Sequence, residues 1–129
     1  MRILLDTHCW LWMQAASKRL SQQTRTLLQD PDNQLFLSAA SSWEIAIKYA
    51  LGKLPLPLPP MEYVLSRMET SGTSPLPVQH SHALHAGSLP YHHADPFDRL
   101  LIAQAQLETL VILTVDRQLE AYEVDLLWA

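Results

Sequence analysis

The stretch RILLD, residues 2–6, opens the chain with an apolar run that ends at an acid. Its three central residues present no polar face to water, which is typical of a strand buried on both sides of a sheet. The stretch VILT, residues 111–114, has the same character, and one residue separates it from Asp116. We therefore expect both runs to be buried strands of a parallel sheet, each leading to an acid.

Helical and strand-like segments alternate along the rest of the sequence. Strands are expected at residues 34–37, 76–78 and 124–128, and helices at residues 7–15, 21–30, 38–52, 61–70, 80–87, 95–110 and 117–122. The stretch LPLPLPP, residues 54–60, can be neither helix interior nor central strand, so we expect an extended connector. The alternation predicts an α/β fold whose parallel sheet is covered by helices on both faces.

Length and composition limit what the chain can be. Its 129 residues predict one domain, spanning residues 1–129. A hydrophobic content of 48% and a charged content of 17% argue against disorder, and no apolar run is long enough to cross a membrane. Cys9 is the only cysteine and no signal peptide is expected, which together favour a reducing, cytoplasmic location. The net charge of −4 weighs against broad binding of nucleic acid through a basic surface.

Four acids are expected at one edge of the predicted sheet. Asp6 and Asp116 follow strands, whereas Glu44 and Asp98 lie in the first turns of two helices. Ligands of open parallel sheets bind beyond the carboxyl ends of the strands. Like charges gathered there raise each other's pKa, so a stable fold has little reason to assemble them without a cation. Oxygen ligands suit magnesium or manganese, which activate water for attack on a phosphodiester. The pattern therefore indicates a nuclease.

Each acid also has a purely structural interpretation. Asp6 can cap a helix, Asp98 can be favoured by the helix dipole, and Asp116 can start a turn. Glu44 fits a capping box that begins at Ser41. The four acids taken together favour the metal site over these separate roles.

Four segments carry a resemblance that runs from Met1 to the final strand. They are ILLDTH (3–8), SAASSWEIAIKYALGKL (38–54), HHADPFDRLLIAQA (92–105) and LTVDRQLEAY (113–122). In order and spacing they resemble the motifs of PIN-domain ribonucleases, and most of all the VapC-type toxins of bacterial toxin–antitoxin pairs. The resemblance implies a three-layer α/β/α sandwich, magnesium- or manganese-dependent endoribonuclease activity, a homodimer, and a cognate antitoxin that occludes the site.

The resemblance also implies roles for individual residues. Asp6, Asp98 and Asp116 would hold the ion, and Glu44 would complete the site or orient the attacking water. Thr7 matches a small hydroxyl residue of the family, and its side chain either bonds a neighbouring carboxylate or a water, or caps the helix. Hydrolysis would leave a 5′-phosphate and a 3′-hydroxyl.

Several polar residues near these motifs have two interpretations. Ala94 stands where many similar sequences carry a basic residue, so one contact to substrate or antitoxin is missing from the pattern. His92 and His93 lie in a loop where they either touch RNA or are solvated. A zinc site is not expected among the remaining histidines, because they lack a fourth ligand. These histidines are His80, His82 and His85.

Tryptophans and basic residues complete the candidates. Core or interface positions are favoured over RNA stacking for Trp10, Trp12 and Trp43. The basic residues that flank the acids either grip the RNA backbone or are surface charges; they are Lys48, Lys53, Arg99 and Arg117. For one of them, Arg99, we expect an ion pair with a neighbouring acid.

Two rival functions remain open. The first is a phosphatase or phosphotransferase that uses Asp6 as a covalent nucleophile, although His8 stands where a haloacid-dehalogenase-like enzyme would want a second aspartate. The second is a PIN-like binding module without catalysis, against which the presence of all four acids argues. The preferred hypothesis is a metal-dependent endoribonuclease that acts on RNA.

Overall fold

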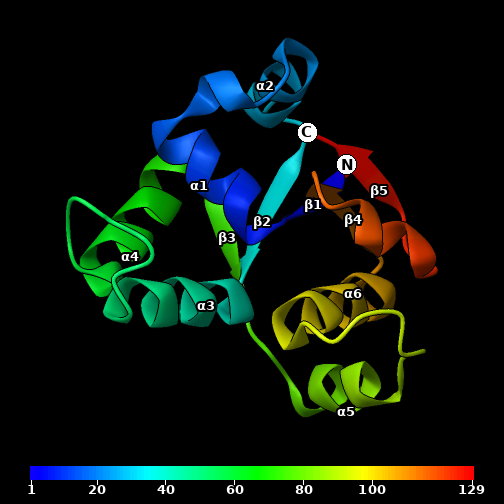
Figure 1. Cartoon of the computed structure of the whole chain (residues 1–129). Coiled ribbons are helices and arrows are strands. Elements are labelled where there is room, and N and C mark those ends of the chain that lie inside the picture. Colours follow the sequence, from blue (N-terminus) through cyan, green and yellow to red (C-terminus); the bar gives the residue numbers. More distant parts are fainter.

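A five-stranded parallel sheet runs through the centre of the computed structural model, which describes residues 1–129 (Figure 1). The sheet order is β3-β2-β1-β4-β5, with the strands β1 (Arg2–Leu5), β2 (Gln34–Ser38), β3 (Thr73–Leu76), β4 (Val111–Thr114) and β5 (Leu126–Trp128). The helices are α1 (Thr7–Ala15), α2 (Gln22–Gln29), α3 (Ala39–Ala50), α4 (Pro60–Ser71), α5 (His80–Ser88) and α6 (Pro96–Glu108). Short 3₁₀ helices, η1 (Ser17–Arg19) and η2 (Arg117–Ala121), complete the chain.

Helices cover both faces of the sheet and create two apolar cores. Because side chains alternate along a strand, Ile3 and Leu5 face one core and Leu4 faces the other. The first core packs against α1, α3 and α4, and the second against α6 and η2. In Figure 1 the helices α1 to α4 and the helices α5 and α6 accordingly lie on different sides of the strands. The α/β/α sandwich with a central parallel sheet is confirmed.

The strand order reverses at β1, and this reversal determines where a site can form. From β1 the chain moves outward to β2 and β3, then returns to the other side of β1 for β4 and β5. The helices that follow β1 and β4 therefore leave in different directions, which opens a crevice at the carboxyl ends of these two neighbouring strands. Both strands end next to the acids that the sequence singled out.

The bounds of two strands differ from the prediction by two residues or more, whereas β2 extends only one residue further, to Ser38. β3 occupies Thr73–Leu76 rather than 76–78, although it contains Pro75. Proline is tolerated there because β3 is an edge strand that pairs only with β2, so a missing N–H need not break the sheet. The last strand, β5, begins at Leu126 instead of 124.

The buried face of α4 also differs from the prediction. Helical spacing in the expected helix at residues 61–70 puts Met61, Val64, Leu65 and Met68 on one apolar side, but Met61 and Leu65 are 78% and 63% exposed. Tyr63 takes their place in the core beside Val64 and Met68, which are buried.

No helix has the length and apolar character required to span a membrane.

Candidate metal centre

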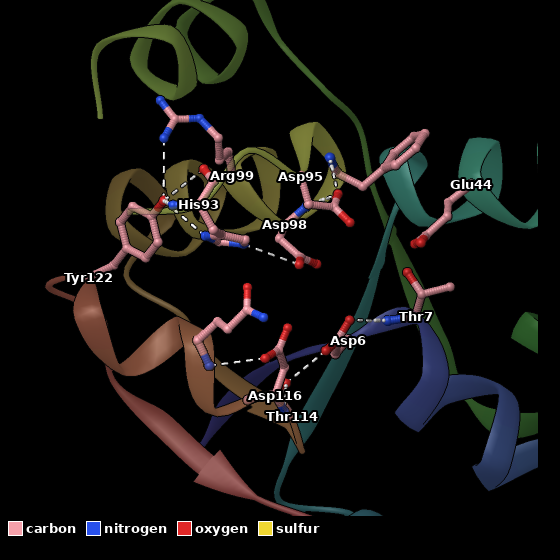
Figure 2. A network of polar contacts seen from close by, with 12 residues as sticks. Asp6, Thr7, Glu44, His93, Asp95, Asp98, Arg99, Thr114, Asp116 and Tyr122 are labelled. Atoms are coloured by element: carbon pink, nitrogen blue, oxygen red, sulfur yellow. Dashed lines mark hydrogen bonds and ion pairs between the residues drawn. The ribbon is translucent and has the colours of Figure 1, made fainter. Parts of the chain in front are cut away.

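Four carboxylates from four parts of the chain point toward one another at the crevice (Figure 2). Asp6 directly follows β1, and Asp116 follows β4, the strand beside it. Asp98 lies in the first turn of α6 and Glu44 lies in α3. The structure therefore brings together all four acids that the sequence predicted.

Asp6 is the most enclosed of the four, with 7% of its surface exposed. Its Oδ1 accepts the backbone N–H of Thr7 over 2.8 Å, so Asp6 does cap α1. Its Oδ2 accepts the Thr114 hydroxyl over 2.7 Å. Burial raises the pKa of Asp6, and these two hydrogen bonds oppose the rise. Capping and a place in the acid cluster are thus combined in one residue.

Asp95 and Asp98 have separate environments at the start of α6. Asp95 is the N-cap, and its Oδ1 accepts the N–H groups of Phe97 at 2.9 Å and Asp98 at 3.2 Å. Asp98 is the third helical residue, where the helix dipole favours a negative charge. Burial and repulsion nevertheless dominate, because they raise the pKa of Asp98 to about 8, with Asp6 the strongest of the repelling neighbours.

Glu44 lies in the second turn of α3 and is nearly buried. The capping-box interpretation is wrong, because α3 begins earlier and Ser38 is its N-cap, accepting the N–H of Ala40 over 3.0 Å. Glu44 Oε2 instead receives Lys48 Nζ over 2.8 Å, one helical turn away. This ion pair partly neutralises the charge of Glu44, so Lys48 is a partner of one acid of the cluster.

Asp116 combines a local role with its place in the cluster. Its Oδ1 accepts the N–H of Gln118 over 3.0 Å and so caps η2, as the turn interpretation predicted. In Figure 2 its carboxylate also faces those of Asp6 and Asp98. Its backbone N–H donates to Thr114 Oγ1 over 3.0 Å. A cap at this position therefore fixes the loop that carries the acid.

Two residues beside the acids escaped the sequence analysis. Thr114, fully buried, bonds both Asp6 and the backbone of Asp116. The sequence did carry a signal for Thr114, because it is the polar last residue of an otherwise apolar strand that lies close to an acid. Tyr122 contacts His93, and no local pattern indicates that contact. The Thr7 hydroxyl donates to Ser41 Oγ over 2.8 Å, so it donates to no carboxylate, and Asp6 rather than Thr7 caps α1.

Arg99 forms no ion pair, which corrects the expectation. It is 6% exposed, and its guanidinium donates to the carbonyls of Pro90, Ala86 and Leu89 and to the Tyr122 hydroxyl. Buried among carbonyls, it satisfies its hydrogen bonds without an acid. Arg117 pairs with Glu120 over 2.9 Å.

The other candidate residues separate into structural and exposed groups. Trp10 is fully buried in the core, whereas Trp43 is 64% exposed and lies edge-on to Phe97. His82 is buried and bonds Glu108 over 2.8 Å, and His85 bonds Gln106 over 2.7 Å. These two histidines of α5 thus have structural partners within the protein, whereas His80 is exposed. Cys9 is buried, and burial raises the pKa of its thiol to about 12, so it is not an activated nucleophile.

The donor chemistry of the cluster fits a hard divalent cation. Its four carboxylates supply only oxygen, the ligand type that magnesium and manganese prefer. Glu44 pairs with Lys48 and Asp98 contacts His93, whereas Asp6 and Asp116 form no ion pair with a basic side chain. No three acids close to chelating distance.

The comparisons with known proteins agree with this architecture. Residues 3–125 match the family model of the PIN domain. A 63-residue segment is 57% identical to Ribonuclease VapC16 of Mycobacterium tuberculosis (strain ATCC 25618 / H37Rv), and the match covers 49% of this chain and 45% of that protein.

Two solved structures share the fold at low sequence identity. VapBC2 from Rickettsia felis, bound to a DNA fragment from its promoter, superposes with a TM-score of 0.72 and 15% identity over 99% of this chain and 98% of that chain. DNA-bound VapBC from Salmonella typhimurium superposes with a TM-score of 0.72 and 16% identity over the same shares. With its sequence matched from β1 into the segment before β5, and with the acids gathered where β1 and β4 end, the chain belongs to the PIN domain family.

Proposed function

We propose that this protein is a magnesium- or manganese-dependent endoribonuclease that acts as the toxin of a toxin–antitoxin pair. The observation that carries the proposal is the convergence of Asp6, Glu44, Asp98 and Asp116 on one crevice, with the pKa of Asp98 raised to about 8 by burial and its acidic neighbours. The ribonuclease with 57% identity supports the reaction class, although its match covers less than half of either chain.

The acids divide the work by their positions. Asp6, Asp98 and Asp116 would hold the ion, because they come from the two strand ends and the facing start of α6. A bound divalent ion would activate water and neutralise the scissile phosphate. Glu44 lies across the crevice and forms an ion pair with Lys48. It would complete the metal site or orient the attacking water. Hydrolysis would leave a 5′-phosphate and a 3′-hydroxyl.

The geometry disfavours Asp6 as a covalent nucleophile. Both of its carboxylate oxygens accept hydrogen bonds, from Thr7 and from Thr114, and the side chain is almost fully buried. Hydrogen bonds of this kind stabilise the carboxylate where it is and make it a weaker nucleophile. The phosphatase alternative therefore has less support than hydrolysis by a metal-activated water.

The proposed partners are RNA, a cognate antitoxin and a second copy of the chain. The VapBC complexes that share the fold support an antitoxin. The homodimer is supported by exposed apolar side chains such as Trp43, Met61 and Leu65 on α3 and α4. A cytoplasmic location is supported by a single cysteine that is buried and unpaired.

The test is RNA cleavage by the purified protein. Structured RNA should be cut in manganese and left intact in EDTA, and Asp98→Asn should abolish the cleavage. Mapping of the product ends should find 5′-phosphates. Cleavage that is unchanged in EDTA, or that persists in the Asp98→Asn variant, would contradict the proposal.

A further inference from the structure

His93 links Asp98 to a buried network behind the acid cluster. It lies in the loop between α5 and α6, and its Nε2 is 3.3 Å from Oδ2 of Asp98. Its Nδ1 is 3.0 Å from the Tyr122 hydroxyl, which also receives Arg99 Nη1 over 3.3 Å. Figure 2 shows the continuous series of contacts from Arg99 through Tyr122 and His93 to Asp98.

The hydrogen bonds of Tyr122 determine which nitrogen of His93 carries the proton. The Tyr122 oxygen accepts Arg99 Nη1–H and the backbone N–H of His93, both over 3.3 Å. With those acceptor positions used, the hydroxyl proton is left to donate. Nδ1 of His93 is its nearest acceptor at 3.0 Å, since the His93 carbonyl is 3.5 Å away. A neutral imidazole that accepts at Nδ1 carries its proton at Nε2, the nitrogen that faces Asp98.

The far end of this network is buried and held by several hydrogen bonds. Arg99 and Tyr122 are each 6% exposed, and three backbone carbonyls at the end of α5 and in the following loop hold the guanidinium. The His93 ring packs against the Tyr122 ring at 5.4 Å between centroids and an angle of 64°. A ring fixed at Nδ1 and along its side has little freedom to turn Nε2 away from Asp98.

We propose that His93 is a positioning residue that holds the Asp98 carboxylate in the acid cluster, and that Tyr122 and Arg99 hold His93 in the Nε2–H tautomer that does so. The inference rests on the proposed metal-dependent function. Nε2–H occupies Oδ2 of Asp98, which leaves Oδ1 for the ion and fixes the rotation of the carboxylate. Loss of a hydrogen bond to a ligating side chain typically lowers metal affinity about 10- to 100-fold.

The experiment measures manganese binding by calorimetry, without RNA, for wild type and variants at one pH. His93→Ala should bind manganese about 10-fold more weakly or worse. His93→Gln should retain most of the affinity, because its amide N–H reaches the position of Nε2. His92→Ala is the matched control: His92 packs edge-on against Tyr122 at 4.8 Å between centroids but bonds no acid, so its loss should leave the affinity unchanged.

A second readout follows the tautomer directly. Nitrogen-15 correlation spectra of the histidine ring should place the His93 proton at Nε2 in the metal-free wild-type protein. Tyr122→Phe keeps the buried ring and removes only the hydroxyl, so the Nε2–H population and the manganese affinity should fall together. The tautomer of His93 in the wild-type protein can be read even if the variants fail to fold.

The outcomes separate the inference from the proposed function. A wild-type protein that binds no manganese would overturn both. A wild-type protein that binds manganese, together with a His93→Ala variant that binds it equally tightly, would overturn the positioning role alone. A proton found at Nδ1 of wild-type His93 would overturn that role as well.

Discussion

The hydroxyl of Thr114 donates to Oδ2 of Asp6 over 2.7 Å and joins the ends of the neighbouring strands β4 and β1. The hydroxyl oxygen of Thr114 also accepts the backbone N–H of Asp116 over 3.0 Å. One buried hydroxyl therefore holds two acids of the cluster in register, although 108 residues separate Thr114 from Asp6. The parallel pairing of β1 and β4 makes this possible, because it places both carboxyl ends at one edge of the sheet.

Replacing that hydroxyl should impair the cluster more than the fold. Thr114→Val keeps the shape of the side chain but removes the hydrogen bond that lowers the pKa of Asp6, so this pKa should rise further. Protons then compete better with the metal, and the acid limb of the pH–rate profile for RNA cleavage should move to higher pH. The free energy of unfolding should fall by about 1 kcal/mol or more, because the N–H of Asp116 loses its partner.

Thr24→Val is the control for that variant. Thr24 is also buried, and its hydroxyl donates over 3.4 Å to the carbonyl of Trp128, the β5 residue paired with Thr114, but bonds no acid. We expect a comparable loss of stability in urea titrations and an unchanged pH–rate profile. If both variants shift the profile equally, Thr114 has no special connection to Asp6.

The raised pKa of Asp98 makes the stability of the metal-free protein depend on pH. A carboxyl with a pKa of about 8 when folded, against about 3.9 when unfolded, binds more protons in the folded state between those values. Its contribution to the free energy of unfolding should therefore be greatest below about pH 4 and decline up to about pH 8. The raised pKa of Asp6 acts in the same direction.

Melting curves in EDTA across that range test the sign. The difference in Tm between Asp98→Asn and wild type should increase as the pH rises, because only the wild-type side chain becomes charged. Magnesium binds the ionised carboxylates, so the Tm gain from magnesium should also grow with pH. A constant difference between the two proteins would show that Asp98 ionises normally.

Local signals explain which parts of the fold and site were predictable. The apolar run before Asp6 and the Asp95–Pro96 pair each define an element boundary within a few residues, and both boundaries are confirmed. The acids that follow such boundaries could be placed at one sheet edge because parallel pairing leaves few alternatives. Thus the convergence of the cluster was predictable, whereas the binding of a metal ion there stays a prediction.

The features that escaped prediction depend on distant segments. Arg99 was expected to pair with an acid because acids are near it in sequence, but the end of α5 supplies carbonyls that satisfy it instead. Tyr122 meets His93 only through the packing of η2 beside the loop before α6. The spacing in α4 also misplaced Met61, since periodicity defines an apolar stripe but not how much of it a neighbour covers.

A homodimer should use the exposed apolar side chains of α3 and α4. Of the tryptophans expected in the core or at an interface, Trp10 is fully buried in the core, whereas Trp43 is 64% exposed and available to an interface. Trp43→Asp should therefore weaken the dimer in sedimentation equilibrium. Leu84→Asp, on α5 and at a site 75% exposed, should not. A wild-type protein that is monomeric at micromolar concentrations would exclude the dimer.

Asp95 should contribute to stability rather than to cleavage. Its carboxylate accepts two backbone N–H groups at the start of α6. Asp95→Ala removes this cap and should lower the free energy of unfolding by about 1 kcal/mol, with RNA cleavage partly retained. Chemical denaturation in EDTA and a cleavage rate in manganese provide the two measurements.

Asp98→Asn should show the reverse pattern in the same two measurements. The amide is neutral at every pH, so it removes the repulsion from Asp6 and the other acids, and the metal-free variant should be as stable as wild type or more stable. It is a poorer ligand for a hard cation, so cleavage should fall by orders of magnitude. The two substitutions lie three residues apart at one helix start, which makes each a control for the other. If Asp95→Ala abolishes cleavage at unchanged stability while Asp98→Asn cuts RNA normally, the third acid of the metal centre is Asp95.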